Sequence, residues 1–167
     1  MHRCTDAQMH MENKSFMEEI IQLNSGAKLS PHFTLGEMTK SNSHPEVYNI
    51  PSHEAIANLK RLCGWLEVLR ERSGTPIRIN SGYRSPQLNR KIGGAANSNH
   101  LTGCAADIKV AGMEQALRYA VILLDYADES KQEFDELLIE KNRYGAIWVH
   151  FAVRPKENRR KILFINA

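Results

Sequence analysis

Residues 98–107 read Ser98-Asn99-His100-Leu101-Thr102-Gly103-Cys104-Ala105-Ala106-Asp107, and a loop pattern changes to a strand pattern within them. The run before His100, residues 93–99, is rich in glycine and asparagine and predicts a loop. From residue 104 the side chains alternate, with Cys104, Ala106, Ile108 and Val110 on one strand face and Ala105, Asp107 and Lys109 on the other. A histidine at the loop mouth and an aspartate on the polar strand face can therefore contact one metal ion.

A second alternating strand is predicted over residues 147–153, with Trp148 and His150 on the face opposite its apolar residues. If the two strands are antiparallel neighbours, His150 meets His100 and Asp107 on a shared face. Two imidazoles, one carboxylate and a water are typical of catalytic zinc. Nitrogen and oxygen ligands without thiolates favour a catalytic site over a structural one. The sequence therefore predicts a Zn²⁺ site.

Three motifs in this order resemble the zinc D-alanyl-D-alanine carboxypeptidases, which are grouped with lysostaphin-type endopeptidases and the Hedgehog signalling domain. They are Ser81-Gly82-Tyr83-Arg84-Ser85, Ser98-x-His100 through Asp107, and Trp148-Val149-His150. The resemblance covers roughly Phe33 to the end of the chain. It implies His100, Asp107 and His150 as the zinc ligands.

The general base is predicted from the same resemblance. Many family members carry an acidic residue three positions before the last histidine, but this chain has Ile147 there. The Hedgehog-like pattern has Phe-Asp, four residues and then Glu, which matches Phe134, Asp135 and Glu140. We therefore expect Glu140 to act as general base and acid, with Asp135 and Glu136 in reserve. The alternative for Glu140 is an exposed strand residue.

Substrate contacts are predicted at four further positions. A guanidinium suits a carboxylate or a developing oxyanion, and the resemblance gives Arg84 that role. Ser98 either binds the substrate carboxylate or caps its loop. Trp148 and Tyr83 either line the pocket or pack in the ordinary way.

The rest of the chain predicts an α+β fold with a small antiparallel sheet and helices packed on one face, Hedgehog/DD-peptidase-like. A capping box at Thr34 and Glu37 starts one short helical turn. Further helices are predicted from Ser52 to about Arg72, from Pro86 to about Ile92 and from Met113 to about Asp128, with strands over 76–80 and 134–141.

The 167 residues predict one domain, a zinc peptidase domain over 31–167, preceded by a partly disordered extension over 1–30 with helical spacing at 15–23. No apolar run is long enough for a membrane span. Three cysteines match no zinc-clip spacing. With no secretory signal visible, we expect a cytoplasmic location as synthesised. We also expect a monomer.

The formal net charge is +3, and basic residues gather over 154–161. We interpret this cluster as a solvated tail, with a weak attraction to anionic cell-wall polymers as the alternative. No aromatic interleaving accompanies the charges, so nucleic acid is not expected as a partner.

The expected function is zinc-dependent hydrolysis of peptidoglycan stem peptides, as a D-Ala-D-Ala carboxypeptidase or an endopeptidase, with Glu140 deprotonating a metal-activated water. By analogy alone, a phage-type lysis enzyme released through a membrane pore fits the missing signal. The alternative is a Hedgehog-like zinc-binding interaction module without catalysis, which Ile147 supports. A structural protein of a phage particle is the third interpretation.

Overall fold

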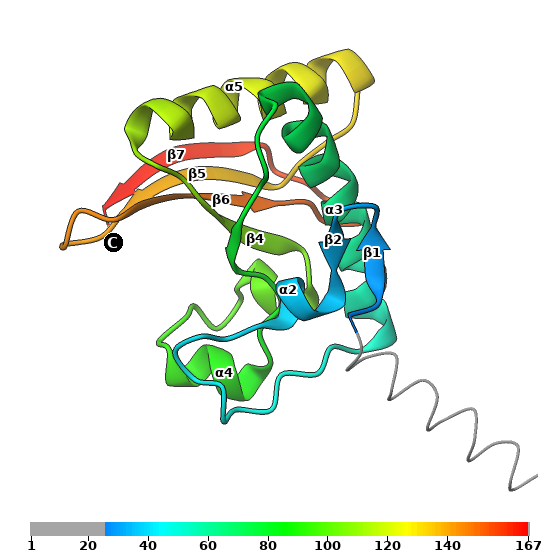
Figure 1. Cartoon of the computed structure of the whole chain (residues 1–167), viewed down its shortest axis with the longest axis vertical. Coiled ribbons are helices and arrows are strands. Elements are labelled where there is room, and N and C mark those ends of the chain that lie inside the picture. Colours follow the sequence, from blue (N-terminus) through cyan, green and yellow to red (C-terminus); the bar gives the residue numbers. More distant parts are fainter. Residues whose placement is uncertain (1–25, 167) are drawn as a thin grey trace, which may run out of the picture.

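The structure is a computed structural model that describes residues 26–166 (Figure 1). Its elements, in chain order, are β1 (Lys28–Ser30), β2 (Phe33–Thr34), α2 (Leu35–Thr39), α3 (His53–Ser73), β3 (Ile79–Ser81), α4 (Pro86–Lys91), the 3-10 helix η1 (Asn99–Thr102), β4 (Ala105–Lys109), α5 (Met113–Ser130), β5 (Glu136–Lys141), β6 (Ile147–Ala152) and β7 (Lys161–Asn166). The predicted α+β class is confirmed.

A five-stranded sheet, ordered β3-β4-β6-β5-β7, carries the strands that the sequence singled out. Its pairs are antiparallel except for β5 and β7, which run parallel. The predicted antiparallel pairing of the two motif strands is confirmed, since β4 pairs with β6 and Asp107 stands opposite His150. The pairing places their side chains on one face, as the alternation requires.

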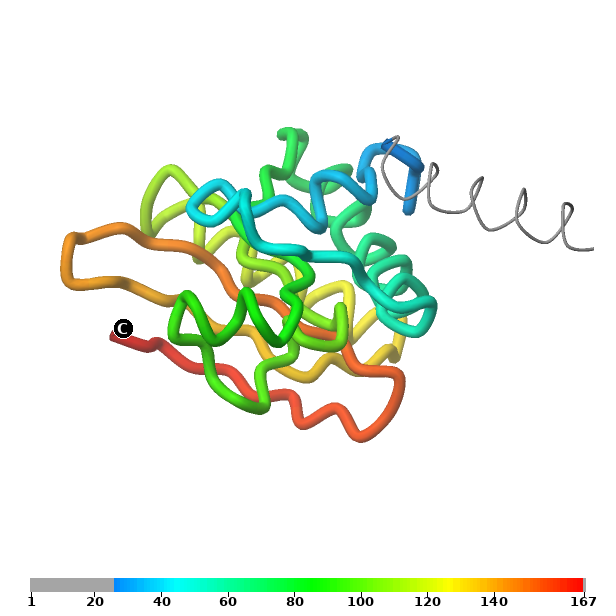
Figure 2. The backbone as a smooth tube through the Cα atoms, turned by 90° about the horizontal axis from the view of Figure 1, so that it is seen from below, coloured from blue at the N-terminus to red at the C-terminus, as the bar shows by residue number. Residues whose placement is uncertain are grey.

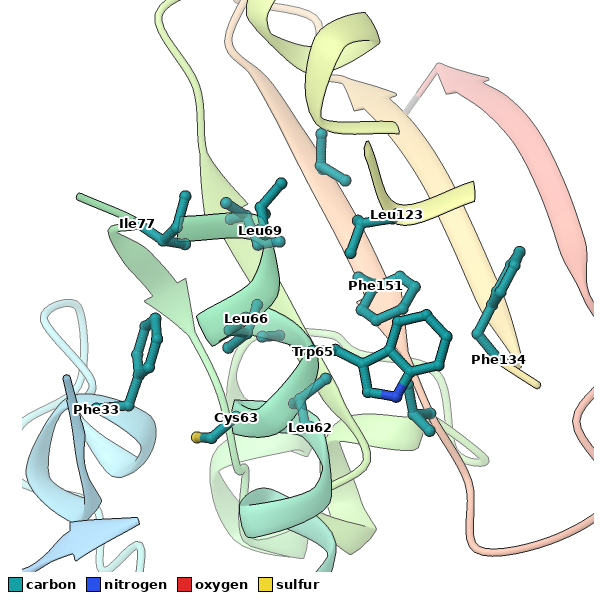
Figure 3. Packing of buried hydrophobic residues seen from close by; sticks show 14 of the residues in the cluster. Phe33, Leu62, Cys63, Trp65, Leu66, Leu69, Ile77, Leu123, Phe134 and Phe151 are labelled. Atoms are coloured by element: carbon teal, nitrogen blue, oxygen red, sulfur yellow. The ribbon is translucent and has the colours of Figure 1, made fainter. Parts of the chain in front are cut away.

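The two long helices, α3 and α5, pack on one face of this sheet, whereas α4 and η1 lie on the side away from α5 (Figures 1 and 2). Between the long helices and the sheet lies the apolar core. In it Trp65 of α3 contacts Phe134 and Phe151, with ring centroids 6.3 and 5.3 Å away (Figure 3). All three side chains are at most 2% exposed. The opposite face of the sheet is left for polar residues.

Helix ends follow the predicted caps. The Ser52 hydroxyl accepts the Ala55 N–H at 3.1 Å, and Gly74, with φ of 68°, ends α3. Thr34 and Glu37 form the expected capping box. Ser85 caps α4 ahead of Pro86.

Most of the predicted extension over 1–30, including the helical spacing at 15–23, lies outside the described residues. Within the described part, Lys28–Ser30 pairs with β2, and the Ser30 hydroxyl donates to Glu67 Oε1 at 2.6 Å. The folded region thus reaches back at least to Lys28. The division into extension and domain stays a prediction.

The interpretation of residues 154–161 as a solvated tail is wrong for its last residues. The Arg159 guanidinium donates to the buried Asp135 carboxylate, and the Lys161 N–H donates to the Asp135 carbonyl at 2.9 Å. These contacts start β7 beside β5. The charged residues therefore help to hold an edge strand in place. The charge pattern could not predict this, because Asp135 is distant from them in the sequence.

Among residues 26–166, none of the helices combines the length and apolar character that crossing a membrane requires.

Candidate metal centre

His100 is held by a tightly packed turn. The Ser98 hydroxyl accepts the His100 N–H at 3.2 Å and so caps η1. Gly103 ends η1 with φ of 74°, and a Cβ there would lie 2.5 Å from the Ala55 carbonyl oxygen of α3. Only glycine fits both the left-handed conformation and this close approach. The turn therefore fixes where the His100 ring, 2% exposed, can lie.

The two ring nitrogens of His100 have different partners. Nδ1 lies 2.6 Å from the Gly82 carbonyl oxygen, and Nε2 lies 3.3 Å from Asp107 Oδ1. A carbonyl only accepts, so Nδ1 carries the proton and donates it. The lone pair of Nε2 is then directed at Asp107, the tautomer that a metal ligand needs.

His150 is arranged in the same way through the opposite nitrogens. Its Nδ1 lies 2.9 Å from Asp107 Oδ1, and its Nε2 lies 3.0 Å from Glu136 Oε2. When Nε2–H donates to Glu136, the Nδ1 lone pair faces Asp107. The structure therefore brings together all three predicted ligands, whose ligand atoms lie within 4.8 Å of one another.

This donor set fits a tetrahedral divalent ion. Zinc bonds to nitrogen and oxygen of about 2.0–2.2 Å imply roughly 3.3–3.5 Å between neighbouring ligand atoms. The separations of Asp107 Oδ1 from the two imidazole nitrogens are 3.3 and 2.9 Å, close to this range, and the two imidazole nitrogens lie within 4.8 Å of each other. A carboxylate and two imidazoles this close and this buried need a cation or a shared proton between them.

The pKa values of Asp107 and His150 also indicate that a positive charge is needed between the ligands. Burial alone would raise the pKa of Asp107, but the contacts with His100 and His150 outweigh it and hold this pKa far below its usual range. Burial would lower the pKa of His150, whereas hydrogen bonds to Asp107 and Glu136 raise it to about 9. In the metal-free protein a proton therefore lies between the ligands, and a metal ion would have to displace it.

A partly buried ionic network lies behind the ligands, with Asp135 fully buried and Arg159 half exposed. Arg159 donates to both oxygens of Asp135, at 2.9 and 2.7 Å, and to Glu136 Oε1 at 2.9 Å. Asn99 donates to Asp135 Oδ2 at 2.7 Å and to Glu136 Oε2 at 3.0 Å. Because Asn99 precedes His100 and Glu136 binds His150, the network connects both histidine-bearing segments.

The same contacts bear on whether Asp135 or Glu136, the two reserve candidates, can act as the general base. The hydrogen bond from His150 is the main reason that the pKa of Glu136 falls to about 2. For Asp135 burial acts in the opposite direction, but the hydrogen bonds from Arg159 and Asn99 lower its pKa to about 2. Since the oxygens of both carboxylates already accept hydrogen bonds, neither is placed to accept a proton from water. The sequence did not predict that Arg159 and Asn99 bind these two carboxylates. The Phe134-Asp135 motif indicated only that Asp135 has a role, not which residues contact it.

Glu140 stands apart from this network. It pairs across the sheet with Trp148 and lines a cleft of about 450 Å³ together with the three ligands. Its carboxylate accepts no hydrogen bond from a described residue. Burial, followed by the charge of Asp107, raises the pKa of Glu140 above its usual value. It is a half-buried carboxylate with available oxygens beside the candidate metal centre.

Of the predicted substrate contacts, three lie at the cleft and one does not. Arg84, Ser98 and Trp148 line it, and Arg84 donates to Asp107 Oδ2 and to Ser81 Oγ, both at 2.9 Å. Tyr83 is 7% exposed and belongs to the apolar core, so its prediction as a pocket residue is corrected. At Gly82 the chain passes so close to the Met38 carbonyl that a Cβ would collide with it, and the Tyr83 N–H donates to the same carbonyl at 2.7 Å.

Comparison with known proteins agrees with the motif resemblance. A family model described as Peptidase M15 matches residues 31–136. A zinc D-Ala-D-Ala carboxypeptidase of Streptomyces albus G is 34% identical over 91 residues, which are 54% of this chain and 36% of that relative. The chain thus matches about a third of the length of this curated relative. The family match contains His100 and Asp107, whereas Glu140 and His150 lie beyond it and reach the site through β5 and β6.

Proposed function

This chain belongs to the peptidase M15 family, and we propose that it is a zinc-dependent peptidase that hydrolyses peptidoglycan stem peptides next to D-amino acids. The observation that carries the proposal is the convergence of His100, Asp107 and His150, each with a lone pair facing the others. The relative's name supports zinc as the metal and D-Ala-D-Ala as the substrate. Carboxypeptidase and endopeptidase action both fit.

The proposed chemistry divides between the metal ion and side chains of this chain. Zinc, when bound, lowers the pKa of a water to about 7 and polarises the scissile carbonyl. Glu140 takes a proton from the attacking water and returns it to the leaving amine, because its raised pKa suits both transfers. Glu140 lies on the same sheet face as the ligands and lines the same cleft, which supports a short proton transfer.

Arg84 orients one of the metal ligands. Its guanidinium holds Asp107 Oδ2, which leaves Oδ1 facing the two histidines. Its positive charge beside the cleft also suits a developing oxyanion. Ser98 and Trp148 line the wall along which a peptide would lie.

A Glu140→Gln variant tests this proposal. It removes the proton acceptor and keeps the shape, so cleavage is expected to fall by about 10²–10⁴-fold with zinc content unchanged. Products from defined stem peptides are followed by mass spectrometry, and zinc by elemental analysis. Glu71→Gln, an exposed substitution on α3, is the matched control and is expected to keep full activity. A Glu140→Gln variant as active as the wild type would exclude Glu140 as the base.

The second candidate function is a zinc-holding interaction module without hydrolysis. Ile147 favours it, because an apolar residue that packs against the core takes the position of the family's acidic residue. The same experiment separates the two functions. A wild-type protein that holds zinc and cleaves no stem peptide is an interaction module.

A further inference from the structure

The site-facing side of the sheet continues past the metal ligands to the edge strand β7. One row across the strands runs from Asp107 through His150 and Leu138 to Leu163. Leu163 is 45% exposed on this face. In the neighbouring row Lys161 stands beside Glu136, and Lys161 lines the same cleft as the ligands. On β7 the cleft is therefore bordered by Lys161, and the exposed Leu163 lies two residues further along the same strand face, just outside the residues that line the cleft.

Lys161 is the available cation of this cleft. The other two cations that line it are engaged, since Arg84 binds Asp107 and Ser81 while Arg159 binds Asp135 and Glu136. The Lys161 ammonium makes no ion pair with any residue of the described part of the chain. Its row neighbour Glu136 does not capture it, because both Glu136 oxygens accept from other residues. Three N–H donors thus remain for a ligand.

The charge balance of the cleft indicates what that ligand is. Three cations line it, Arg84, Arg159 and Lys161, against three carboxylates, and Asp135, which binds Arg159 from behind, is a fourth carboxylate. A bound divalent ion adds two positive charges, so the loaded cleft carries a net positive charge and attracts anions. A peptide substrate offers one kind of anion, the carboxylate.

We propose that Lys161 and Leu163 form a subsite for an acidic peptide, in which the Lys161 ammonium binds a substrate carboxylate and Leu163 packs against the adjoining aliphatic part. The subsite deepens the proposed peptidase function and rests on it for the nature of the ligand. It makes β7, which lies outside the matched family segment, a determinant of specificity.

The sheet spacing limits where that carboxylate lies in the substrate. Lys161 is two strands away from His150 and two residues along them, roughly 12 Å at about 4.8 Å per strand and about 3.3 Å per residue. An extended peptide also advances about 3.3 Å per residue, so the carboxylate lies within about four residues of the cleaved bond. Both a terminal carboxylate and an acidic side chain meet this limit, and the test distinguishes them.

The test measures peptide binding to the full-length, zinc-loaded protein in a Glu140→Gln background, where turnover does not interfere. The probes are a peptide that contains one D-Glu and ends in D-Ala-D-Ala, its D-Gln analogue, and its C-terminal amide. Adding Lys161→Met is expected to weaken binding of the parent peptide about five- to ten-fold. Binding of the one analogue that lacks the recognised carboxylate is expected to change less than about two-fold. That analogue identifies the carboxylate as terminal or side-chain.

Two variants keep the test decisive. Lys161→Arg retains the cation and is expected to bind the parent within about two-fold of the background. Lys60→Met, an exposed substitution on α3 outside the cleft, is the control and is expected to change nothing. Equal loss with all three peptides, or no loss with any, overturns the subsite.

Failure of the subsite and failure of the proposed function give different results. A protein that cleaves stem peptides while Lys161→Met leaves every affinity unchanged is a peptidase without this subsite. A wild-type protein that binds the parent peptide through Lys161 but cleaves nothing has the subsite without the peptidase function.

Discussion

Phe151 and His150 are neighbours on β6, both are buried, and they point to opposite faces of the sheet. Phe151 lies among aromatic rings, where contact is non-directional and many arrangements of similar volume are acceptable. His150 lies between two carboxylates and is useful only if each nitrogen meets its own partner. One strand therefore contributes stability through one face and a precise donor geometry through the other.

The largest effect is expected from His150→Ala on metal binding. Removing one of three ligands is expected to lower zinc affinity at least about 1,000-fold, more than the 10–100-fold typical of loss of an outer partner. Without metal the free energy of unfolding is expected to fall by about 1–3 kcal/mol, because Asp107 and Glu136 each lose a buried hydrogen bond. The loss stays limited because Asp107 keeps Arg84 and His100 as partners. Competition with a chromophoric chelator measures the affinity, and urea denaturation in a chelator measures stability.

His44→Ala is the control for this prediction, since His44 lies in a loop and contacts Glu46 far from the cleft. It is expected to keep wild-type zinc affinity. Retention of that affinity by His150→Ala would show that the ligand set is wrong and that the two faces of β6 do not differ as described.

The next effect concerns the other face of the same strand. Phe151→Ala is expected to lower the free energy of unfolding by about 3–5 kcal/mol, because the cavity opens against Trp65 and Phe134. Phe164→Ala on β7, where the ring is 70% exposed, is expected to cost less than about 0.5 kcal/mol. Both are measured by urea denaturation without metal. A loss below about 1 kcal/mol for Phe151→Ala would mean that the core does not depend on this face.

Period-two alternation was enough to predict which face Asp107 and His150 share, because a strand has only two faces. The caps at Ser52 and Thr34 and the helix start at Pro86 were likewise predicted, since each depends on residues within one helical turn. These parts of the fold depend on local rules. These rules predict which strand residues face the apolar core, and they place the metal ligands on the opposite face of the sheet.

The partners on the polar face could not be predicted in this way. Glu136 and Arg159 are 23 positions apart, and nothing local indicates that they meet. The parallel pairing of β7 with β5 brings them together, and an apolar strand after a basic cluster does not specify its register. Tyr83 shows the opposite limitation. Its motif indicated a site residue, whereas in the structure its N–H binds the Met38 carbonyl and its side chain lies in the apolar core.

The smallest of the expected effects depends on pH and tests whether the ionic network around the buried Asp135 stabilises the polar face. The folded pKa of Asp135 is about 2, against 3.8 as the ordinary value. A lowered carboxylate pKa contributes stability that is complete above about pH 4 and is lost as the pH falls toward 2. Since Asp135 is fully buried, this contribution is expected to be about 2 kcal/mol. Urea denaturation of the wild type and of Asp135→Asn, in a chelator from pH 5 to pH 2, measures this contribution. The difference in the free energy of unfolding between the two proteins is expected to become smaller as the pH falls.

Glu46 provides the matched control, because its pKa is also about 2, lowered chiefly by the hydrogen bond from Lys91, but its carboxylate is exposed. Solvent screens an exposed pair and its side chains lose conformational entropy on pairing, so Glu46→Gln is expected to show a much smaller pH-dependent gap. If the pH-dependent differences in the free energy of unfolding were equal for the two variants, burial of Asp135 would add nothing to its pair with Arg159. The polar face would then be stabilised no more than an exposed ion pair stabilises the surface. A larger gap for Asp135 means that the segments carrying the metal ligands are fixed by directional bonds, as the core is fixed by packing.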